Sequence, residues 1–255
     1  MPIQFLRRLS GRRRTTKANQ HLGMALSFVA GAVNAGGFLS VHQYTSHMTG
    51  IISSISDDIV LGNITLALAG LGAFLAFFAG AACSAILINW ARRKRLQSQY
   101  ALALLLEATL LLGFGLLGGM LVPSAGFGVS GTVMLLCFIM GLQNAIITKI
   151  SRAEIRTTHI TGLLTDIGIE LGKLFYWNMD RASLNTSSVK ANRPRLALLT
   201  TLMGMFFIGA VIGALSFKHV GFASTIPLAA FLLFFASVPV LDDVRLHQRR
   251  LMRPR

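Results

Sequence analysis

The chain has 255 residues and a mean hydropathy of +0.63, with 53% apolar and only 13% charged residues. Soluble domains carry about 25% charged residues, so this composition excludes an ordinary soluble protein and predicts an integral membrane protein. The formal net charge of +15 comes from 24 basic against 9 acidic residues. The placement of the basic residues is therefore informative about topology.

Six apolar windows follow one another along the chain, and each approaches the roughly 20 residues that cross a bilayer as a helix. They lie at about 22–39, 65–88, 100–121, 131–150, 196–217 and 221–240. We predict a single all-α membrane domain at 22–241, between basic cytoplasmic tails at 1–21 and 242–255.

Three short motifs occur twice and in the same order. Ser-His-Met-Thr-Gly at 46–50 returns 112 residues later as Thr-His-Ile-Thr-Gly at 158–162. Gly-x-x-Asn-Ala precedes each copy and Phe-Phe-x-Gly-Ala follows it, at 31–35 and 77–81 in the first half and at 141–145 and 206–210 in the second. This order predicts an internal duplication, with repeats at about 22–122 and 129–241.

Two further segments, at about 49–61 and 161–177, are apolar on one side but carry acidic residues. The distribution of Lys and Arg decides whether they cross, because basic residues are retained on the cytoplasmic side during insertion. If only the six windows cross, Lys218 alone lies outside; if the weak segments also cross, the basic clusters at 92–95 and 149–156 join it. The charge pattern favours six transmembrane helices with both termini cytoplasmic.

Each repeat then holds three crossings, and an odd number places the two repeats in the membrane with opposite orientation. We therefore predict two inverted three-helix repeats, each with a short polar re-entrant or broken helix segment that begins at its histidine motif. Inverted repeats with broken helices recur in transporters, whose sites lie near the midplane where the repeats meet.

The paired motifs predict a substrate-binding site. Ser and Thr are good helix N-cap residues, helix N-termini bind anions, and imidazole titrates near pH ~6.5, so it can donate or relay protons. The residues of this expected site are Asn34, Ser46, His47, Thr49, Asn144, Thr158, His159 and Thr161. The alternatives are that the hydroxyl residues only cap helices, that the histidines bond backbone carbonyls, and that the asparagines only pack against small neighbours.

Three carboxylates are expected to couple protons or ions, because acidic residues inside a membrane are costly and usually have a function. Asp58 and Glu170 share the 112-residue offset, whereas Glu107 lies well inside the third window with no basic residue nearby in sequence. Glu107 is expected to face a cavity or a partner. The alternative for Asp58 and Glu170 is solvation at the membrane interface.

No nucleotide-binding loop, cysteine metal pair or His-Glu-x-x-His helix occurs, and Cys83 and Cys137 lie in separate windows. We predict no cofactor, no metal and no catalytic residue. The expected partners are the lipid bilayer and a small solute. The Arg-rich tail is explained more simply by orientation beside anionic lipid than by nucleic acid, and stripes of small residues such as Gly70 and Gly80 serve packing within the chain or a homo-oligomer.

Gly-Leu-Gln-Asn-Ala at 141–145, the stretch Glu154 to Gly162 and Ser-His-Met-Thr-Gly at 46–50 together resemble the YoaK-like family of bacterial inner-membrane proteins, a domain of unknown function. The resemblance covers about residues 20 to 240 and implies a multi-pass protein of the bacterial inner membrane without an established activity. Members often carry Asn after the first Thr-Gly, where this chain has Ile51.

Two functions remain open at this point. The inverted polar repeat favours a transporter or channel for a small polar or anionic solute. The alternative is a membrane-embedded enzyme or accessory subunit that acts on a lipid-borne substrate through Glu107 or the duplicated carboxylates.

Overall fold

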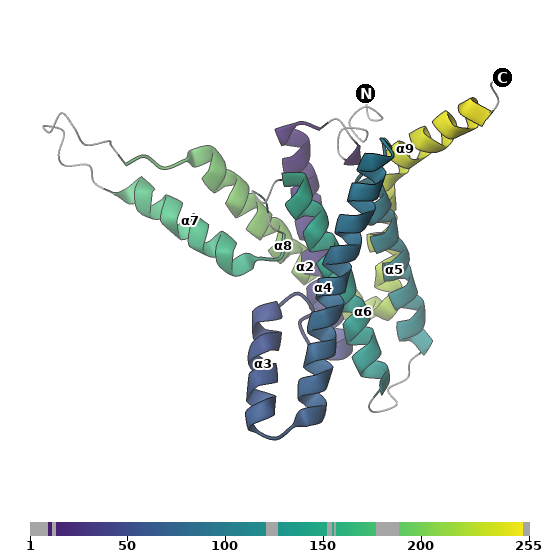
Figure 1. Cartoon of the computed structure of the whole chain (residues 1–255). Coiled ribbons are helices and arrows are strands. Elements are labelled where there is room, and N and C mark those ends of the chain that lie inside the picture. Colours follow the sequence, from purple (N-terminus) through teal and green to yellow (C-terminus); the bar gives the residue numbers. More distant parts are fainter. Residues whose placement is uncertain are drawn as a thin grey trace, which may run out of the picture.

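The computed structural model describes residues 10–11, 14–120, 127–151, 155, 157–176 and 189–251, and this part of the chain forms helices and connections without a strand. In chain order the helices are α2 (Thr16–Val41), α3 (Met48–Val60), α4 (Ile64–Arg93), α5 (Ala101–Met120), α6 (Phe127–Ser151), α7 (Ile160–Phe175), α8 (Arg193–Val220), the 3₁₀ helix η1 (Gly221–Ser224) and α9 (Thr225–Leu251) (Figure 1).

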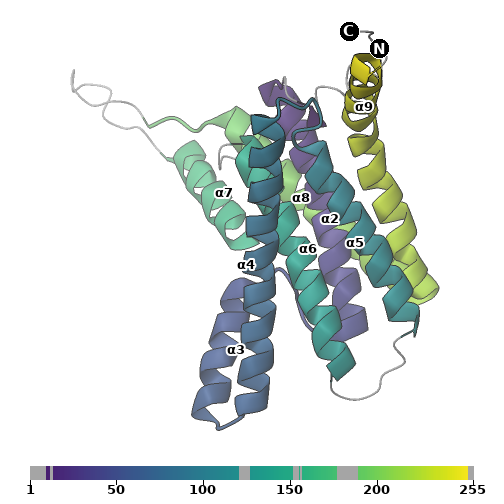
Figure 2. The same ribbon diagram turned by 45° about the vertical axis from the view of Figure 1, so that its right-hand side comes forward.

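Five stretches of helix in the described residues are long and apolar enough to cross a membrane: Thr16–Val41, Ile64–Arg93, Ala101–Gly118, Gly131–Ser151 and Arg193–Leu246. The last has 54 residues, and an unbroken helix of that length would measure about 81 Å, far more than the ~30 Å hydrocarbon core. It consists of α8 and α9, which are separated by Gly221 at φ 66° and by η1. Helix α9 then returns beside α5 (Figure 2).

Helices α3 and α7 are the two short ones. With 13 and 16 residues they measure about 20 and 24 Å, so neither reaches across the hydrocarbon core unaided. Each packs against the helix that follows it, α3 against α4 and α7 against α8, and the two hairpins extend from the bundle in different directions (Figure 1).

The helical boundaries differ from the apolar windows at both ends of the chain. Helix α2 begins at Thr16, inside the expected N-terminal tail, because the Thr15 side chain caps it by accepting a bond from the Ala18 N–H at 3.2 Å. Helix α9 continues to Leu251, through most of the expected C-terminal tail.

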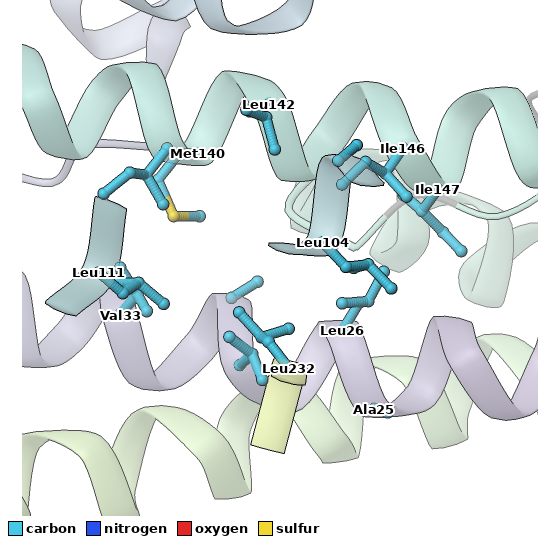
Figure 3. Close-up of a cluster of buried hydrophobic side chains, with 14 of the residues drawn as sticks. Ala25, Leu26, Val33, Leu104, Leu111, Met140, Leu142, Ile146, Ile147 and Leu232 are labelled. Carbon is cyan, nitrogen blue, oxygen red and sulfur yellow. The ribbon is translucent and has the colours of Figure 1, made fainter. Parts of the chain in front are cut away.

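The core lies where α2, α5, α6 and α9 meet (Figure 3). Leu26 of α2, Leu104 of α5, Leu142 of α6 and Leu232 of α9 are each fully buried there. In their central parts these helices are largely apolar around the whole circumference, which is typical of helices that lie in a core or in lipid.

Helices α4 and α8 instead present apolar side chains outward. Phe78 of α4 is 67% exposed and Phe207 of α8 is 68% exposed, and both hold the second position of the Phe-Phe-x-Gly-Ala motif. Large apolar side chains left exposed in this way mark a surface for membrane or protein contact. The duplicated motif thus has one face directed away from the protein.

The other face of that motif packs against the opposite half of the chain. A Cβ atom on Gly31 of α2 would lie 2.0 Å from the Phe206 carbonyl oxygen of α8, and one on Gly209 of α8 would lie 2.0 Å from the Phe28 carbonyl oxygen of α2. No real side chain fits at that distance, so the two helices approach backbone to backbone. Glycine is required at both positions.

The pair formed by α4 and α6 repeats this arrangement. A Cβ on Gly141 of α6 would lie 2.0 Å from the Phe77 carbonyl oxygen of α4, and one on Gly80 of α4 would lie 2.0 Å from the Phe138 carbonyl oxygen of α6. Each Gly-x-x-Asn-Ala motif therefore packs on the Phe-Phe-x-Gly-Ala motif of the other half. Of the two packing roles expected for Gly80, the structure shows the one within the chain.

Candidate functional site

The first histidine motif forms the start of α3. His47 occupies the N-cap position at φ −94° and ψ 68°, and its side chain makes no capping bond. A Cβ on Gly50 would lie 2.2 Å from Cδ2 of the His47 ring, so the imidazole lies directly against the first turn of the helix. The glycine of the motif is needed to make room for the histidine.

The second motif adopts the same local structure at the start of α7. His159 occupies the N-cap position at φ −87° and ψ 62°, again without a side-chain capping bond. A Cβ on Gly162 would lie 2.2 Å from Nδ1 of the His159 ring. The two copies thus share the backbone conformation and the packing of the ring on the glycine, although Cδ2 and Nε2 of His47 but Nδ1 and Cε1 of His159 make the contact. The expected N-cap role of Ser and Thr is wrong at the cap position itself, which the histidine holds.

Asn34 anchors the first motif to α2. Its Oδ1 accepts hydrogen bonds from the Ser46 N–H at 3.2 Å and from the Ser46 hydroxyl at 2.9 Å. The second half lacks this anchor among the described residues: Asn144 is half-buried, its carbonyl oxygen accepts from the Thr148 hydroxyl at 2.7 Å, and its side chain makes no bond to Thr158. The two asparagines therefore have different roles.

The N-terminal ends of α3 and α7 lie near one another on the same side of the bundle, in both views (Figures 1 and 2). The two helices then run apart. The histidines and the threonines of both motifs, His47, Thr49, His159 and Thr161, are exposed in the single chain, while Asn34, Ser46, Asn144 and Thr158 are half-buried. The fold thus brings the two predicted motifs to one region of the molecule without enclosing them.

Two further threonines of the duplicated segment are buried. Thr45 and Thr157 are each 0% exposed, and neither hydroxyl has a hydrogen-bond partner among the described residues. A buried unsatisfied polar group costs about 1–3 kcal/mol. The sequence carries a signal for this pair, because the 112-residue offset that aligns the histidines also aligns these residues; it was missed because the motif was read from the next position onward.

Glu170 of α7 is a structural contact. Its carboxylate accepts a bond from the Asn192 N–H at 2.7 Å and from Lys173 Nζ at 2.9 Å, and its side chain is buried. The bond from Asn192, followed by the contact with Lys173, lowers the pKa of Glu170 below its usual value. Glu170 therefore fastens α7 to the start of α8, where Asn192 is the N-cap.

Asp58 of α3 lies in a different environment despite the shared offset. It is half-exposed and lines a cavity of about 260 Å³ between α3 and α4, together with Gln43, Ser54 and Val133. Its backbone oxygen, rather than its carboxylate, accepts the bond from the Asn63 N–H at 2.7 Å. The positional equivalence predicted for Asp58 and Glu170 does not extend to their contacts.

Glu107 of α5 lies in the hydrophobic core. It is 0% exposed, the helical spacing of three and four residues places Leu104 and Leu111 on the same helix face, and neither carboxyl oxygen has a hydrogen-bond partner among the described residues. The partner expected for this residue is thus not found in the part of the chain that the structure describes. Burial of a carboxyl group in such surroundings costs several kcal/mol if the group is charged.

A family model described as Protein of unknown function (DUF1275) matches residues 22–238 of the chain. The chain belongs to this family. The UPF0700 transmembrane protein YoaK of Bacillus subtilis (strain 168) is 28% identical over 193 residues, which are 75% of this chain and 80% of that protein. No solved structure matches the chain.

Membership of the DUF1275 family confirms the resemblance inferred from the repeated motifs. The transmembrane relative and the apolar helices together establish a multi-pass membrane protein. The family match includes both histidine motifs and all four close-contact glycines but begins after Arg14 and the first turn of α2.

Proposed function

We propose that this protein is a transporter or channel for a small polar or anionic solute, built from two inverted three-helix repeats. The solute site lies where the N-terminal ends of α3 and α7 approach one another. The observation that carries this proposal is the pair of similar helix starts, one from each half, in which a histidine ring packs against a glycine in the same region of the molecule.

The contacts between the halves support the inverted arrangement. Helix α2 packs on α8 as α6 packs on α4, and α5 packs on α9, so helices at equivalent places in the two repeats have equivalent neighbours. The close glycine contacts show the same pairing at single residues, because Gly31 and Gly209 join α2 to α8 as Gly141 and Gly80 join α6 to α4. Such a pattern is expected when a two-fold axis relates the two halves.

The directions of the helices support it as well. One cavity is lined by the start of α2 at Thr16, the end of α4 at Arg92, the end of α6 at Ser151 and the first turns of α8 at Leu198. Helices α2 and α6 therefore run in opposite directions, and so do α4 and α8. Equivalent helices of antiparallel direction are the property that defines inverted-topology repeats.

The chemistry of the helix starts suits a small anion or a polar solute. The first turn of a helix offers free N–H donors at the positive end of its dipole. The hydroxyl groups of Thr45 and Thr157, buried and without partners in the described part of the chain, add two donors next to these turns in sequence. Glu107 is the carboxylate proposed for proton or ion coupling, because Glu170 is engaged by Asn192.

A flux measurement tests the proposal. The full chain is reconstituted in proteoliposomes and screened with labelled small anions and neutral polar solutes. We expect that replacing His47 and His159 together by Gln lowers the flux by about tenfold or more, the cost of losing a group in direct contact with the solute. The matched control is His219→Gln at the end of α8, outside both motifs.

Unchanged flux in the double variant would show that the two motifs do not line the pathway. The absence of flux with any solute would contradict the transport proposal.

The topology is tested separately with single cysteines in a background without Cys83 and Cys137. Asn63→Cys at the α3–α4 turn and Lys190→Cys ahead of α8, both exposed, should be labelled by a membrane-impermeant maleimide from opposite faces. Labelling from one face would contradict the inverted repeat.

A further inference from the structure

The end of the bundle where α2 begins contains a cavity of about 780 Å³. Four regions that are distant in sequence contribute to it: the chain before α2 with the start of that helix, the end of α4 with Tyr100, the end of α6 with Ile155, and α8 near Leu198. A cavity of several hundred Å³ is the usual size of a small-molecule site. The start of α2 and the end of α4, which line it, lie apart from the helix starts of α3 and α7 (Figure 1).

The charges in this cavity have one sign. Arg14, Arg92 and Lys149 line it, and its described lining contains no Asp or Glu. Asp243 of α9, the acidic residue that reaches the connection before Tyr100, uses its two carboxylate oxygens to accept from the Gln97 and Ser98 N–H groups at 2.9 and 2.7 Å. The excess positive charge is therefore not neutralised by the groups around it in the described structure.

Arg14 is held in a fixed position. Its Nε donates to Oδ1 of Asn19 at 2.7 Å, and its guanidinium carbon lies 5.2 Å from the centre of the Tyr100 ring. Asn19 donates in turn to the Ile150 carbonyl oxygen of α6 at 3.3 Å. These contacts join the start of α2 to the end of α6 and leave the guanidinium little freedom to turn away.

The other end of that guanidinium has no acceptor. Nη1 and Nη2 of Arg14 are both buried and have no hydrogen-bond partner among the described residues. Burial lowers the pKa of Arg14 to about 10, so the group is still charged near neutral pH. A buried charge without a partner is strongly unfavourable, and the paired N–H groups have the geometry that binds carboxylate or phosphate oxygens in a bidentate way.

Two further cations line the same cavity. Lys149 of α6 is held by Oδ1 of Asn89 at 2.9 Å, and Arg92 of α4 is exposed. Three cations exceed the charge of a single carboxylate, whereas a terminal phosphate group, as in a phosphate monoester, carries about −1.5 to −2 at neutral pH and offers three acceptor oxygens. The number and placement of the donors therefore favour a phosphate group.

We propose that this cavity binds a phosphate-bearing anion, with Arg14 as the bidentate anchor and Arg92 and Lys149 as flanking charges. The phosphate belongs either to the headgroup of a lipid that ends in a phosphate monoester, such as phosphatidic acid, or to a small solute. Clusters of basic residues at the end of a membrane helix attract anionic headgroups, and the cavity is large enough for a small phosphorylated compound. This site is separate from the proposed solute pathway and does not depend on it.

The experiment has one arm for each source of phosphate and uses the full chain. In the first, inorganic phosphate is titrated into protein in phosphatidylcholine nanodiscs at low ionic strength and followed by calorimetry. In the second, thermal unfolding is compared between nanodiscs of phosphatidylcholine alone and nanodiscs containing phosphatidic acid, whose headgroup is a terminal phosphate. We expect binding in at least one arm.

We expect Arg14→Gln to weaken binding by about tenfold or more in the arm that shows it, because the bidentate contact is lost. Arg14→Lys, which keeps the charge and loses the fork, should also weaken it. The matched control is Arg93→Gln, because Arg93 is an exposed neighbour of Arg92 that does not line the cavity. It should bind as the unaltered protein does.

Binding in neither arm, or equal binding by the Arg14 variants and the control, would overturn the proposal. If Arg14→Gln does not fold, Arg92→Gln and Lys149→Gln test the same site from outside the packed contact with Tyr100. Each should weaken binding severalfold relative to Arg93→Gln, and unchanged binding by both would overturn the proposal in the same way.

Discussion

The α3–α4 and α7–α8 hairpins begin with the same motif but are held by different polar contacts. Both start with a histidine packed against the glycine three residues later. In the first hairpin Asn34 fixes the residue before the histidine, whereas in the second Glu170 joins the end of α7 to the start of α8. The close steric contact is common to both copies, while the hydrogen bonds that anchor them differ.

The difference shows which constraints a duplicated membrane protein retains. A glycine at a backbone contact that leaves no room for a methyl group cannot be replaced by another residue, because protein interiors are close-packed and have low compressibility. A hydrogen bond can be replaced by a different donor and acceptor elsewhere in the same hairpin. The following predictions test this comparison, beginning with the largest expected effect.

Gly209→Ala should have the largest effect, because the added methyl group meets the Phe28 carbonyl oxygen of the rigid α2 backbone. Overpacking of this kind costs about 1–3 kcal/mol and sometimes more, and the symmetric variant Gly80→Ala should lose as much. Thermal unfolding in detergent measures both. Gly204→Ala in the same helix as Gly209 meets nothing within 4 Å and should be neutral or slightly stabilising; equal loss in Gly204→Ala would contradict the packing argument.

Gly50→Ala and Gly162→Ala should have equal and intermediate effects. Each methyl group would displace a histidine ring rather than a backbone, so part of the strain can be relieved by rotation of the side chain, and we expect about 1–2 kcal/mol. Differential scanning fluorimetry compares the two. A large effect at one position alone would show that the common geometry matters in only one half.

Asn34→Ala should destabilise the start of α3, whereas Asn144→Ala should change little. The first substitution removes two hydrogen bonds to Ser46, worth about 0.5–1.5 kcal/mol each, and the second removes no described side-chain bond. Hydrogen exchange of the amides of residues 43–52 provides the measurement. Equal effects of the two substitutions would mean that the asparagines play equivalent roles after all.

Lowering the pH should loosen the α7–α8 hairpin and leave the α3–α4 hairpin unchanged. The pKa of Glu170 is lower in the folded protein than in the unfolded chain, so its stabilisation is complete above the unfolded value of ~4.3 and is lost as the pH falls through the folded value. Hydrogen exchange of residues 168–176 between pH 6 and pH 3 measures it, and Glu170→Gln should reduce the pH dependence while leaving in place the second carboxylate contact of this hairpin, between Asp166 and Arg195 at 3.0 Å. Loosening of both hairpins together would point to a different titrating group.

Composition alone predicted a membrane protein, and the repeated motifs alone predicted a duplication and the family. The two short helices were predicted as polar segments because their carboxylates and hydroxyls interrupt the apolar pattern, and α3 and α7 begin at the predicted motifs. The contacts of individual side chains were less predictable. Glu170 and Asp58 occupy matching places in sequence, yet only Glu170 meets an N–H group, because that group comes from Asn192 in a connection unlike the α3–α4 turn.

The sequence by itself determined that the chain enters a membrane and consists of two related halves, because hydropathy and internal repetition are local properties that no folding is needed to reveal. Only the tertiary structure decided that the repeated glycines pack across the halves and that Arg14, Arg92 and Lys149 line one cavity. Those residues are separated by dozens of positions in the chain. Their meeting depends on the order and direction in which the helices pack.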